Sequence, residues 1–416
     1  MKVALLFHAL TVKGGSPRLF LSLANSLSNI GHDVHVYAYV LNEKEIPVDL
    51  RNKVDINAVL RISDSSKYLT PNLITRLDLA KDYFLITKKW AKSIRENKFD
   101  IINAHEALSY KAALELKRRE KCPVAWYVAD PASYVNKIGD GRLYDRSLLF
   151  KILLNIFAKY DKQVIRKLDR VMIPNHKLKK VMDAYYGIQS EVIRISGVDT
   201  KFFVPKHNQA EMRSWLEKEM NIPSDSTLTL SVSIHMQHRR FEDAITAVAN
   251  LNKKGHKIHY LIVGSSKPAP DYTAFLRDYI SRIGANGFVH FIDSYISETQ
   301  LLDLYNACDI FLFPNNNQTW GLAPFEAMSV GKPVIVTTGA GVHEVLKDGE
   351  NAFIVNPMDS TAMSEKIETL VVDGTLRCKI AMRGREFVNT EMTWEKCAKR
   401  LVDSFSNLQL AFKSHL

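Results

Sequence analysis

The stretch "DIFLFPNNNQTWGLAPFEAMSVGKPVIVTT", residues 309–338, decides the fold. An apolar run from Ile310 to Phe313 leads into a polar loop, and a second apolar run begins at Val334. Short apolar runs bounded by turn residues are typical of buried strands. Between them we expect a helix from Pro324, because the fixed φ of proline suits the first turn of a helix. The stretch therefore predicts a strand–helix–strand unit, the building block of a parallel sheet covered by helices.

The same alternation of strands and helices recurs in both halves of the chain. Expected strands are "VALLFHAL", "DVHVYAYV", "FDIINAHE", "CPVAWYVADP" and "DRVMIPNH" in the first half, and "TLTLSVS", "KIHYLIVG" and "GFVHFID" in the second. A chain of 416 residues is also too long for one compact core. We therefore predict two doubly wound α/β domains, residues 1–204 and 205–392. A final amphipathic helix within residues 393–416 is expected to cross back onto the first domain, and residues 60–75 are expected to form a loop.

Positive charge is concentrated in the first half. Residues 81–121 hold 11 Lys/Arg against 6 Asp/Glu, and residues 151–182 hold 9 against 2, in a chain of net charge +11. Such a distribution favours an anionic partner for the first domain, or else marks lysine-rich helix faces exposed to solvent. The basic segments lack the interleaved aromatic residues of single-strand nucleic-acid binders, so we expect no nucleic-acid partner.

The loop before Pro324 predicts an anion site. The backbone N–H groups of Gly321 and Leu322 would lie at the positive end of the helix dipole, where phosphate is commonly bound. Glu326 in the first turn is suited to accept hydrogen bonds from a ribose diol, and the Gln318 amide to contact a sugar hydroxyl. The alternative is an ordinary helix start with incidental polar residues.

A second loop, "QHRRFED" (residues 237–243), also lies between a strand and a helix. A guanidinium group there could clamp a diphosphate, because it pairs bidentately with phosphate oxygens. Alternatively, one arginine of the pair simply bonds to Glu242 or Asp243.

Three further groups are candidates in the first domain. Gly14 and Gly15 in "KGGSPR" would let a phosphate or sugar approach the backbone, although the turn lacks the G-x-G-x-x-G pattern and a plain turn is an equal alternative. His105 and Asp130 follow strands at the edge where open α/β sheets bind ligands, which makes them acid/base or substrate-orienting candidates. Each could equally be structural.

The sequence offers no metal or cofactor motif. The four cysteines are scattered without a C-x-x-C pair, and D-x-D, H-E-x-x-H and P-loop patterns are absent. We therefore predict no metal and no cofactor, with diphosphate neutralised by arginine and the helix dipole.

Taken together, these segments resemble the glycosyl transferases group 1 family over nearly the full length. "KGGSPRLFLSLANSLSNIGHDVHVY", "FDIINAHEALS", "VIRISGVDTKFFVP", "LYNACDIFLFP" and "GAGVHEVLKDGENAFIVNPMD" are similar to its motifs. The resemblance implies a GT-B fold, in which two Rossmann-like domains face each other across a cleft. It also implies retaining transfer of a sugar from a nucleotide sugar, UDP- or GDP-linked, to an acceptor hydroxyl.

The resemblance assigns roles residue by residue. Glu326 matches the second of two family glutamates, which binds ribose, and Gln318 replaces the first, which contacts the transferred sugar. Arg239 matches a phosphate-binding lysine, whereas Ile234 stands where the family has an arginine. Tyr295 and Ile296 are placed to flank the base. Gly14, Gly15, His105 and Asp130 would approach the sugar from the first domain; Ala129 and Asp130 lie where many members carry a histidine.

The sequence thus predicts an enzyme of cell-envelope polysaccharide or glycolipid synthesis that is cytoplasmic, either free or peripheral on the inner face of the membrane. The apolar N-terminal run is short and is better explained as a strand than as a signal segment. A sugar or lipid-linked acceptor and an anionic membrane surface are the expected partners beside the donor. Two alternatives remain: a same-fold enzyme with a soluble sugar acceptor, and a non-catalytic sugar-nucleotide-binding protein.

Overall fold

The computed structural model describes residues 1–11, 14–47, 50–63, 86–95, 98–106, 108–129, 158–206, 209–294 and 296–414. The chain forms two compact units, Met1–Ser196 with Trp394–Leu416, and Gly197–Thr393. The expected boundary after residue 204 therefore lies too late. Val198 donates its N–H to the Met392 carbonyl and Phe203 is buried in the core of the second unit, so this segment belongs there.

The first unit is built on a seven-stranded parallel sheet in the order β3-β2-β1-β4-β5-β6-β7. Its strands are β1 (Lys2–Leu10), β2 (Asp33–Leu41), β3 (Ile56–Arg61), β4 (Ile101–His105), β5 (Val124–Tyr127), β6 (Arg170–Ile173) and β7 (Glu191–Val192). Strand β3 was not predicted, and residues 60–61 of the expected loop form its end. Only Ile56 of β3 is buried, because β3 is an edge strand, and so its apolar pattern is weak.

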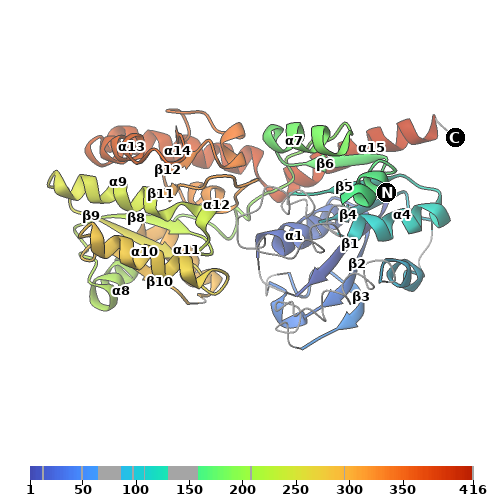
Figure 1. Cartoon of the computed structure of the whole chain (residues 1–416), viewed down its shortest axis with the longest axis horizontal. Coiled ribbons are helices and arrows are strands. Elements are labelled where there is room, and N and C mark those ends of the chain that lie inside the picture. The colour runs from blue at the N-terminus through green and yellow to red at the C-terminus, as the bar shows by residue number, and fades with distance from the viewer. Residues whose placement is uncertain are drawn as a thin grey trace. The chain divides into compact units, whose positions relative to one another are not determined.

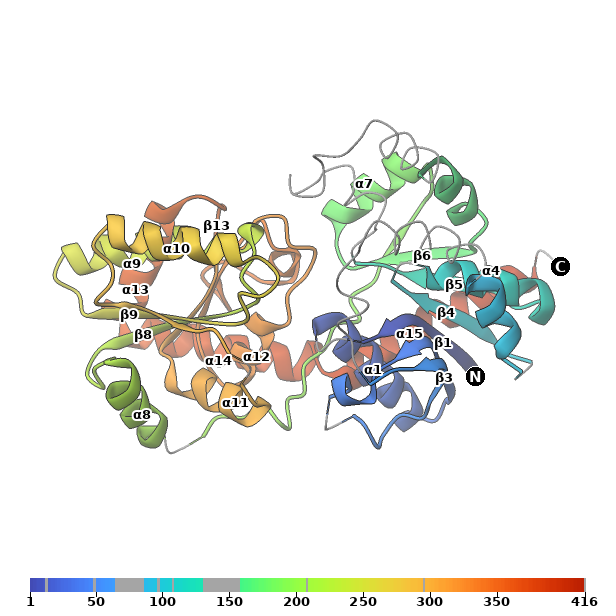
Figure 2. The ribbon, with the colours of Figure 1, turned by 60° about the horizontal axis from the view of Figure 1, so that its bottom comes forward.

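Helices cover both faces of this sheet. They include α1 (Gly15–Asn29), α4 (Ser109–Glu120), α7 (His176–Tyr186) and α15 (Trp394–Lys413), with a 3-10 turn η1 (Glu43–Glu45) after β2. Helix α15 lies beside α1 (Figure 2), and its Leu401 and Phe405 join Leu23 and Leu27 of α1 in one buried cluster. The prediction that the last helix crosses back onto the first domain is confirmed.

The second unit carries a six-stranded parallel sheet in the order β10-β9-β8-β11-β12-β13. Its strands are β8 (Thr227–Val232), β9 (Ile258–Val263), β10 (Val289–Ile292), β11 (Ile310–Phe313), β12 (Val334–Thr337) and β13 (Phe353–Val355). The opening stretch supplies β11, β12 and the helix between them, as predicted.

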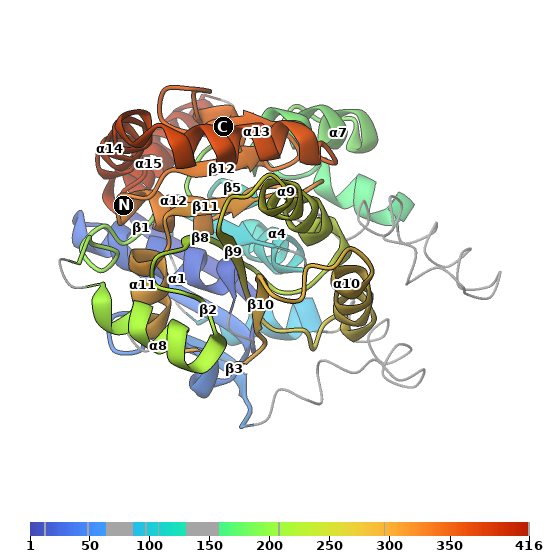
Figure 3. The same cartoon turned by 90° about the vertical axis from the view of Figure 1, so that its left-hand side faces the viewer.

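Helices pack on both faces of the second sheet as well (Figures 1 and 3). Helices α9 (Phe241–Lys253), α10 (Pro270–Arg282) and α13 (Ser360–Val372) cover one face. Helices α8 (Ala210–Met220), α11 (Glu298–Ala307), α12 (Ala323–Ser329) and α14 (Gly374–Glu391) cover the other. Two further 3-10 turns are η3 (Gln237–Arg239) and η4 (Gly341–Val345). The predicted architecture of two doubly wound α/β domains is confirmed.

Candidate functional site

The candidate site lies at the carboxyl edge of the second sheet, between β8 and β11. The strand order reverses there, because β9 and β10 lie on one side of β8 and β11 to β13 on the other. Open parallel sheets bind ligands at such a switch point, outside the carboxyl ends of the strands. Two loops meet at this point, residues 233–240 and 314–322, and the Asn316 N–H donates to the His238 carbonyl at 2.8 Å.

The two arginines of the first loop have different partners. Arg240 is bidentate to Asp243, with Nε–Oδ2 and Nη2–Oδ1 distances of 3.0 and 2.7 Å, and it also pairs with Glu242 at 2.8 Å. The Asp243 hydrogen bonds raise the pKa of Arg240. Arg239 instead donates from Nη1 to Gln318 Oε1 at 2.5 Å. The structure thus answers the choice that the sequence left open: Arg240 holds the loop, and Arg239 reaches the motif after β11.

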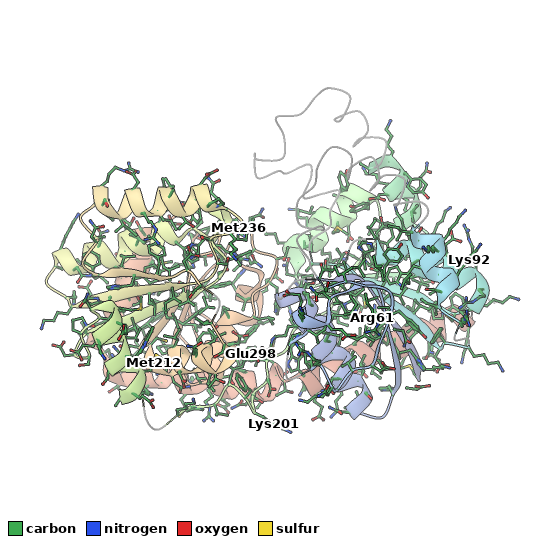
Figure 4. The ribbon with its side chains drawn as sticks, turned by 90° about the horizontal axis from the view of Figure 1, so that it is seen from below. Arg61, Lys92, Lys201, Met212, Met236 and Glu298 are labelled. Atoms are coloured by element: carbon green, nitrogen blue, oxygen red, sulfur yellow. The ribbon has the colours of Figure 1, made fainter. Side chains whose placement is uncertain are left out.

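Turn η3 sets the direction of Arg239. Met236, labelled in Figure 4, directly precedes η3, and its carbonyl accepts the Arg239 N–H at 2.8 Å. Arg240 then adopts a left-handed conformation with φ 53°, which is unfavourable for a residue with a side chain. The side chain of Arg240 is held in this conformation by the carboxylates of Glu242 and Asp243.

Gln318 is held by the neighbouring loop after β12. Its N–H donates to the Gly339 carbonyl, and its carbonyl accepts the Gly341 N–H, both at 2.9 Å. A Cβ at Gly339 would lie 2.6 Å from the Asn315 carbonyl oxygen, so only glycine allows the two loops to approach this closely. With its amide oriented to satisfy both partners, Asn315 accepts from Arg239 Nη1 at 3.2 Å.

Gly321 and Leu322 occupy the entry to α12. Gly321 has φ 157°, and a Cβ there would lie 2.7 Å from the Phe313 ring, so the chain's own packing requires glycine. The Leu322 carbonyl accepts the N–H groups of Phe325 and Glu326 at 2.9 and 3.1 Å, which starts the helix. Gly321 and Leu322 directly precede Ala323, the first helical residue, so their N–H groups lie at the N-terminal end of α12. Their predicted role as donors to an anion is a proposal.

Glu326 lies in the first turn of α12 and is half-buried. Its Oε2 accepts a hydrogen bond from the Tyr305 hydroxyl at 2.7 Å. Burial, together with this carboxylate, raises the pKa of Tyr305 well above its ordinary value, so the hydroxyl remains a donor. One carboxylate oxygen is therefore fixed by α11. Tyr305 lies in the family-like segment "LYNACDIFLFP" but was given no role there, and only the packing of α11 on α12 reveals its contact.

The two residues expected to flank a base have different outcomes. Tyr295 lies outside the described residues. Ile296 is partly buried and packs against the apolar cluster formed with α11 and α12. The described contacts of Ile296 are therefore those of a core residue, and its predicted role is a proposal.

In the first unit the glycine turn lies at the corresponding switch point, between β1 and β4. Gly14 is extended, with φ 178°, and a Cβ there would lie 3.9 Å from its nearest neighbour. Among the described residues, neither the backbone angle nor the packing requires glycine at this position. Gly15 is the first residue of α1.

His105 ends β4 and lies beneath the surface, only 1% exposed. Its Nε2 is 2.7 Å from Asn103 Oδ1, and its ring packs edge-on against Phe20. Burial lowers the pKa of His105 to about 3, so the imidazole is neutral at physiological pH. These contacts favour the structural alternative for His105. Asp130, the other acid/base candidate, lies outside the described residues.

Glu106, which the sequence did not single out, is the better-placed polar residue at this edge. It has φ 59°, an unusual conformation that often accompanies functional sites. Its Oε1 accepts a hydrogen bond from Ser16 Oγ at 2.7 Å, which joins the β4 loop to the start of α1. Its position directly after a strand was the available signal, but the same signal applies to His105, and histidine is the commoner acid/base group.

We predict that His105 makes stability pH-dependent. Its pKa in the folded state, about 3, lies below the ordinary value of 6.5, so the unfolded chain binds more protons between these limits. The contribution of the neutral His105 to the free energy of unfolding is therefore fully present above pH 6.5, and it is lost as the pH falls toward 3. Urea unfolding of wild type and His105→Phe should diverge by about 2 kcal/mol between pH 6.5 and 5. If the free energies of unfolding of the two proteins instead run parallel with pH, and a pKa in the pH–rate profile of wild type disappears in the variant, His105 takes part in proton transfer.

Two doubly wound units, with a strand–loop–helix motif at the switch point of the second, match the GT-B class of glycosyltransferase folds. Comparison with known families is consistent with this class: residues 213–387 match the family "Glycosyl transferases group 1", and residues 13–202 match "Glycosyltransferase Family 4". The chain belongs to the glycosyl transferases group 1 family, as the sequence motifs predicted.

Individual relatives are distant. A D-inositol 3-phosphate glycosyltransferase of Stackebrandtia nassauensis is 23% identical over 59% of this chain and 56% of its own length. The capsular polysaccharide biosynthesis glycosyltransferase CapM of Staphylococcus aureus is 26% identical over 48% of this chain and 51% of its own. The chain thus spans a little over half the length of each of these two relatives. A sucrose-phosphate synthase structure from Thermosynechococcus elongatus superposes with TM-score 0.75 at 17% identity, covering 99% of this chain and 100% of that one.

Proposed function

We propose that this protein is a retaining glycosyltransferase that moves a sugar from a nucleoside diphosphate sugar to an acceptor hydroxyl. The observation that carries the proposal is the contact between Arg239 and Gln318 at the switch point of the second sheet, with Gly321 and Glu326 following Gln318 at the start of α12. A cation and backbone donors in two adjacent loops, with a carboxylate in the helical turn that follows, match the diphosphate and ribose of such a donor. Membership of the glycosyl transferases group 1 family supports it.

In the proposed reaction, the bond between the anomeric carbon and the β-phosphate oxygen breaks while the acceptor oxygen bonds to that carbon from the same face. The acceptor proton passes to the departing phosphate oxygen. Arg239 and the N–H groups of Gly321 and Leu322 stabilise the negative charge that grows on the diphosphate. Glu326 accepts hydrogen bonds from the ribose, and the Gln318 amide contacts the transferred sugar. The donor and product then have the same anomeric configuration.

Charge neutralisation by these groups makes a metal ion unnecessary in the proposal. An arginine and the start of a helix supply the positive field that a divalent ion supplies in other phosphoryl-binding sites. Transfer is therefore expected to continue when a chelator is present. Loss of transfer in chelator, with recovery on adding Mg²⁺ or Mn²⁺, would overturn this part of the proposal.

The acceptor is proposed to be lipid-linked or part of an envelope polysaccharide at a cytoplasmic membrane face. A helical segment, residues 86–93, is followed directly by Ile94 and Arg95. Trp90 and Ile94 are buried, whereas four basic side chains are exposed: Lys88, Lys89, Lys92 and Arg95. Figure 4 labels Lys92 on this segment. Clusters of exposed lysine and arginine are attracted to anionic lipid surfaces. Within the ranges that the structure describes, no helix is both long and apolar enough to span a membrane.

Capsule synthesis by CapM is consistent with an envelope role, whereas sucrose-phosphate synthase is the counterpart with a soluble acceptor. Assays with and without lipid vesicles or lipid extracts distinguish the two. Transfer that requires lipid supports the envelope role, and transfer to soluble sugars alone supports the alternative. Tight donor binding with neither transfer nor hydrolysis would support a non-catalytic binding protein.

The donor is identified by a thermal-shift and calorimetric screen with UDP, GDP, ADP and their sugars. One nucleotide series should bind, and NMR of the product should show retained anomeric configuration. The proposal fails if no nucleotide or nucleotide sugar binds.

A Glu326→Gln variant tests the ribose contact. Glutamine still accepts the Tyr305 hydroxyl, so folding should be unchanged, while removal of the charge should weaken nucleotide binding about tenfold. Glu365→Gln, an exposed substitution on α13, is the control and should bind as wild type. Equal affinity of all three proteins would remove Glu326 from the site.

A further inference from the structure

The contact between Arg239 and Gln318 joins two loops that are 79 residues apart in sequence. Gln318 is the fixed partner in this contact, since its backbone is bonded on both sides to the loop after β12. Its Oε1 accepts from Arg239 Nη1 and, together with Asn315, sets the direction of the guanidinium. An amide oxygen can do this without carrying a net charge.

We infer that Gln318 is a positioning residue that orients Arg239 toward the donor diphosphate while adding no negative charge beside it. The inference rests on the proposed function, which it deepens. It changes the role expected for Gln318: the carbonyl oxygen serves Arg239, and the amide nitrogen is the group through which Gln318 would meet a sugar.

The charge of residue 318 matters because it contacts the guanidinium directly. A carboxylate at the same position would form a charge-assisted hydrogen bond with Arg239, stronger than the present one. That bond would stabilise the free protein, but it would compete with phosphate for the guanidinium and lower the local positive potential. A neutral amide favours anion binding at the expense of stability in the free state.

The neighbouring side chains increase the dependence on Arg239. Arg240, the other arginine of the loop, is engaged with the carboxylates of Glu242 and Asp243. Position 234, directly after the Ser233 that follows β8, is an isoleucine with 40% exposure and offers no charge. An added carboxylate at position 318 would therefore offset a large part of the positive charge that this loop directs to the site.

The test is the near-isosteric variant Gln318→Glu, measured with UDP, GDP and ADP by calorimetry. We expect its affinity for the nucleotide that wild type binds to fall about tenfold or more at low salt. The difference should shrink as NaCl rises, because screening weakens the charge effect. The melting temperature of the ligand-free variant should rise. Opposite changes in stability and affinity are not expected from a residue that only supports the fold.

Three further variants complete the experiment. Gln300→Glu adds the same charge to an exposed position of α11 and should leave binding unchanged. Gln318→Met removes the hydrogen bond without adding charge and should reduce affinity less than Gln318→Glu does. In an Arg239→Gln background, Gln318→Glu should have less than about a twofold further effect, because residues that act through one another are not additive.

Binding of nucleotide by Gln318→Glu as tightly as by wild type would overturn the inference. The inference would also be overturned if Gln318→Met lost as much nucleotide affinity as Gln318→Glu, or more. This second comparison does not depend on how well the glutamate variant folds. Failure of wild type to bind any of the three nucleotides would instead overturn the proposed function, so the two failures are distinguishable.

Discussion

An Arg239→Gln variant should lose about 100-fold or more in kcat/KM for sugar transfer from the nucleotide sugar. Arg239 supplies a guanidinium at the switch point, and removal of one group that stabilises developing negative charge typically costs 100- to 1,000-fold, or roughly 3–4 kcal/mol. Much of the loss should appear in kcat, because charge on the departing diphosphate grows in the transition state. Steady-state kinetics with the identified donor and acceptor measure this directly.

Arg282→Gln is the matched control for this experiment. Arg282 is an exposed arginine of α10 in the same unit and pairs with Asp278 at 2.8 Å, so its loss removes the same charge far from the switch-point loops in sequence. Its kcat/KM should remain within about twofold of wild type, as expected for an exposed ion pair. Equal losses in both variants would mean that overall charge, and not the Arg239 contact, governs turnover.

A Phe405→Ala variant should lose about 3–5 kcal/mol of stability, although it lies near the end of the chain. Phe405 is fully buried and packs α15 against the α1 face of the first sheet. Truncating a buried phenylalanine removes its transfer free energy and leaves a cavity. The melting temperature of the first unit, followed by differential scanning calorimetry, should fall accordingly.

Leu410→Ala on the same helix is the control, because Leu410 is 68% exposed. It should change stability by less than about 0.5 kcal/mol. If the two variants unfold alike, α15 does not contribute to the core of the first unit in solution. That outcome would contradict the packing described for this helix.

Short-range patterns were sufficient for the architecture. Apolar runs such as Ile310–Phe313 and Val334–Thr337 became β11 and β12, and Pro324 lies in the first turn of α12 as expected. These features depend on neighbours within a few residues, which is why the sequence reveals them. Edge strand β3 was not predicted, because only one of its residues is buried and its apolar pattern is therefore weak.

Burial and pairing within the site could not be predicted in the same way. His105 looks like an acid/base residue in sequence, but the packing of α1 and β5 over it makes it neutral and inaccessible. Glu106, one position later, lies in the partly exposed loop beside Ser16. Which of two adjacent polar residues reaches the edge depends on the direction of the backbone there, and φ 59° at Glu106 is set by tertiary contacts.

By itself, the sequence determined two doubly wound α/β domains, the returning final helix and the family, because hydrophobic periodicity and turn residues act over short distances. Only the tertiary structure decided that Arg239 rather than Arg240 meets Gln318, and that residues 197–204 belong to the second unit. Those outcomes depend on contacts between segments far apart in the chain. Arg239 and Gln318 are neighbours because β8 and β11 pair in one sheet, and no local pattern in either segment records that pairing.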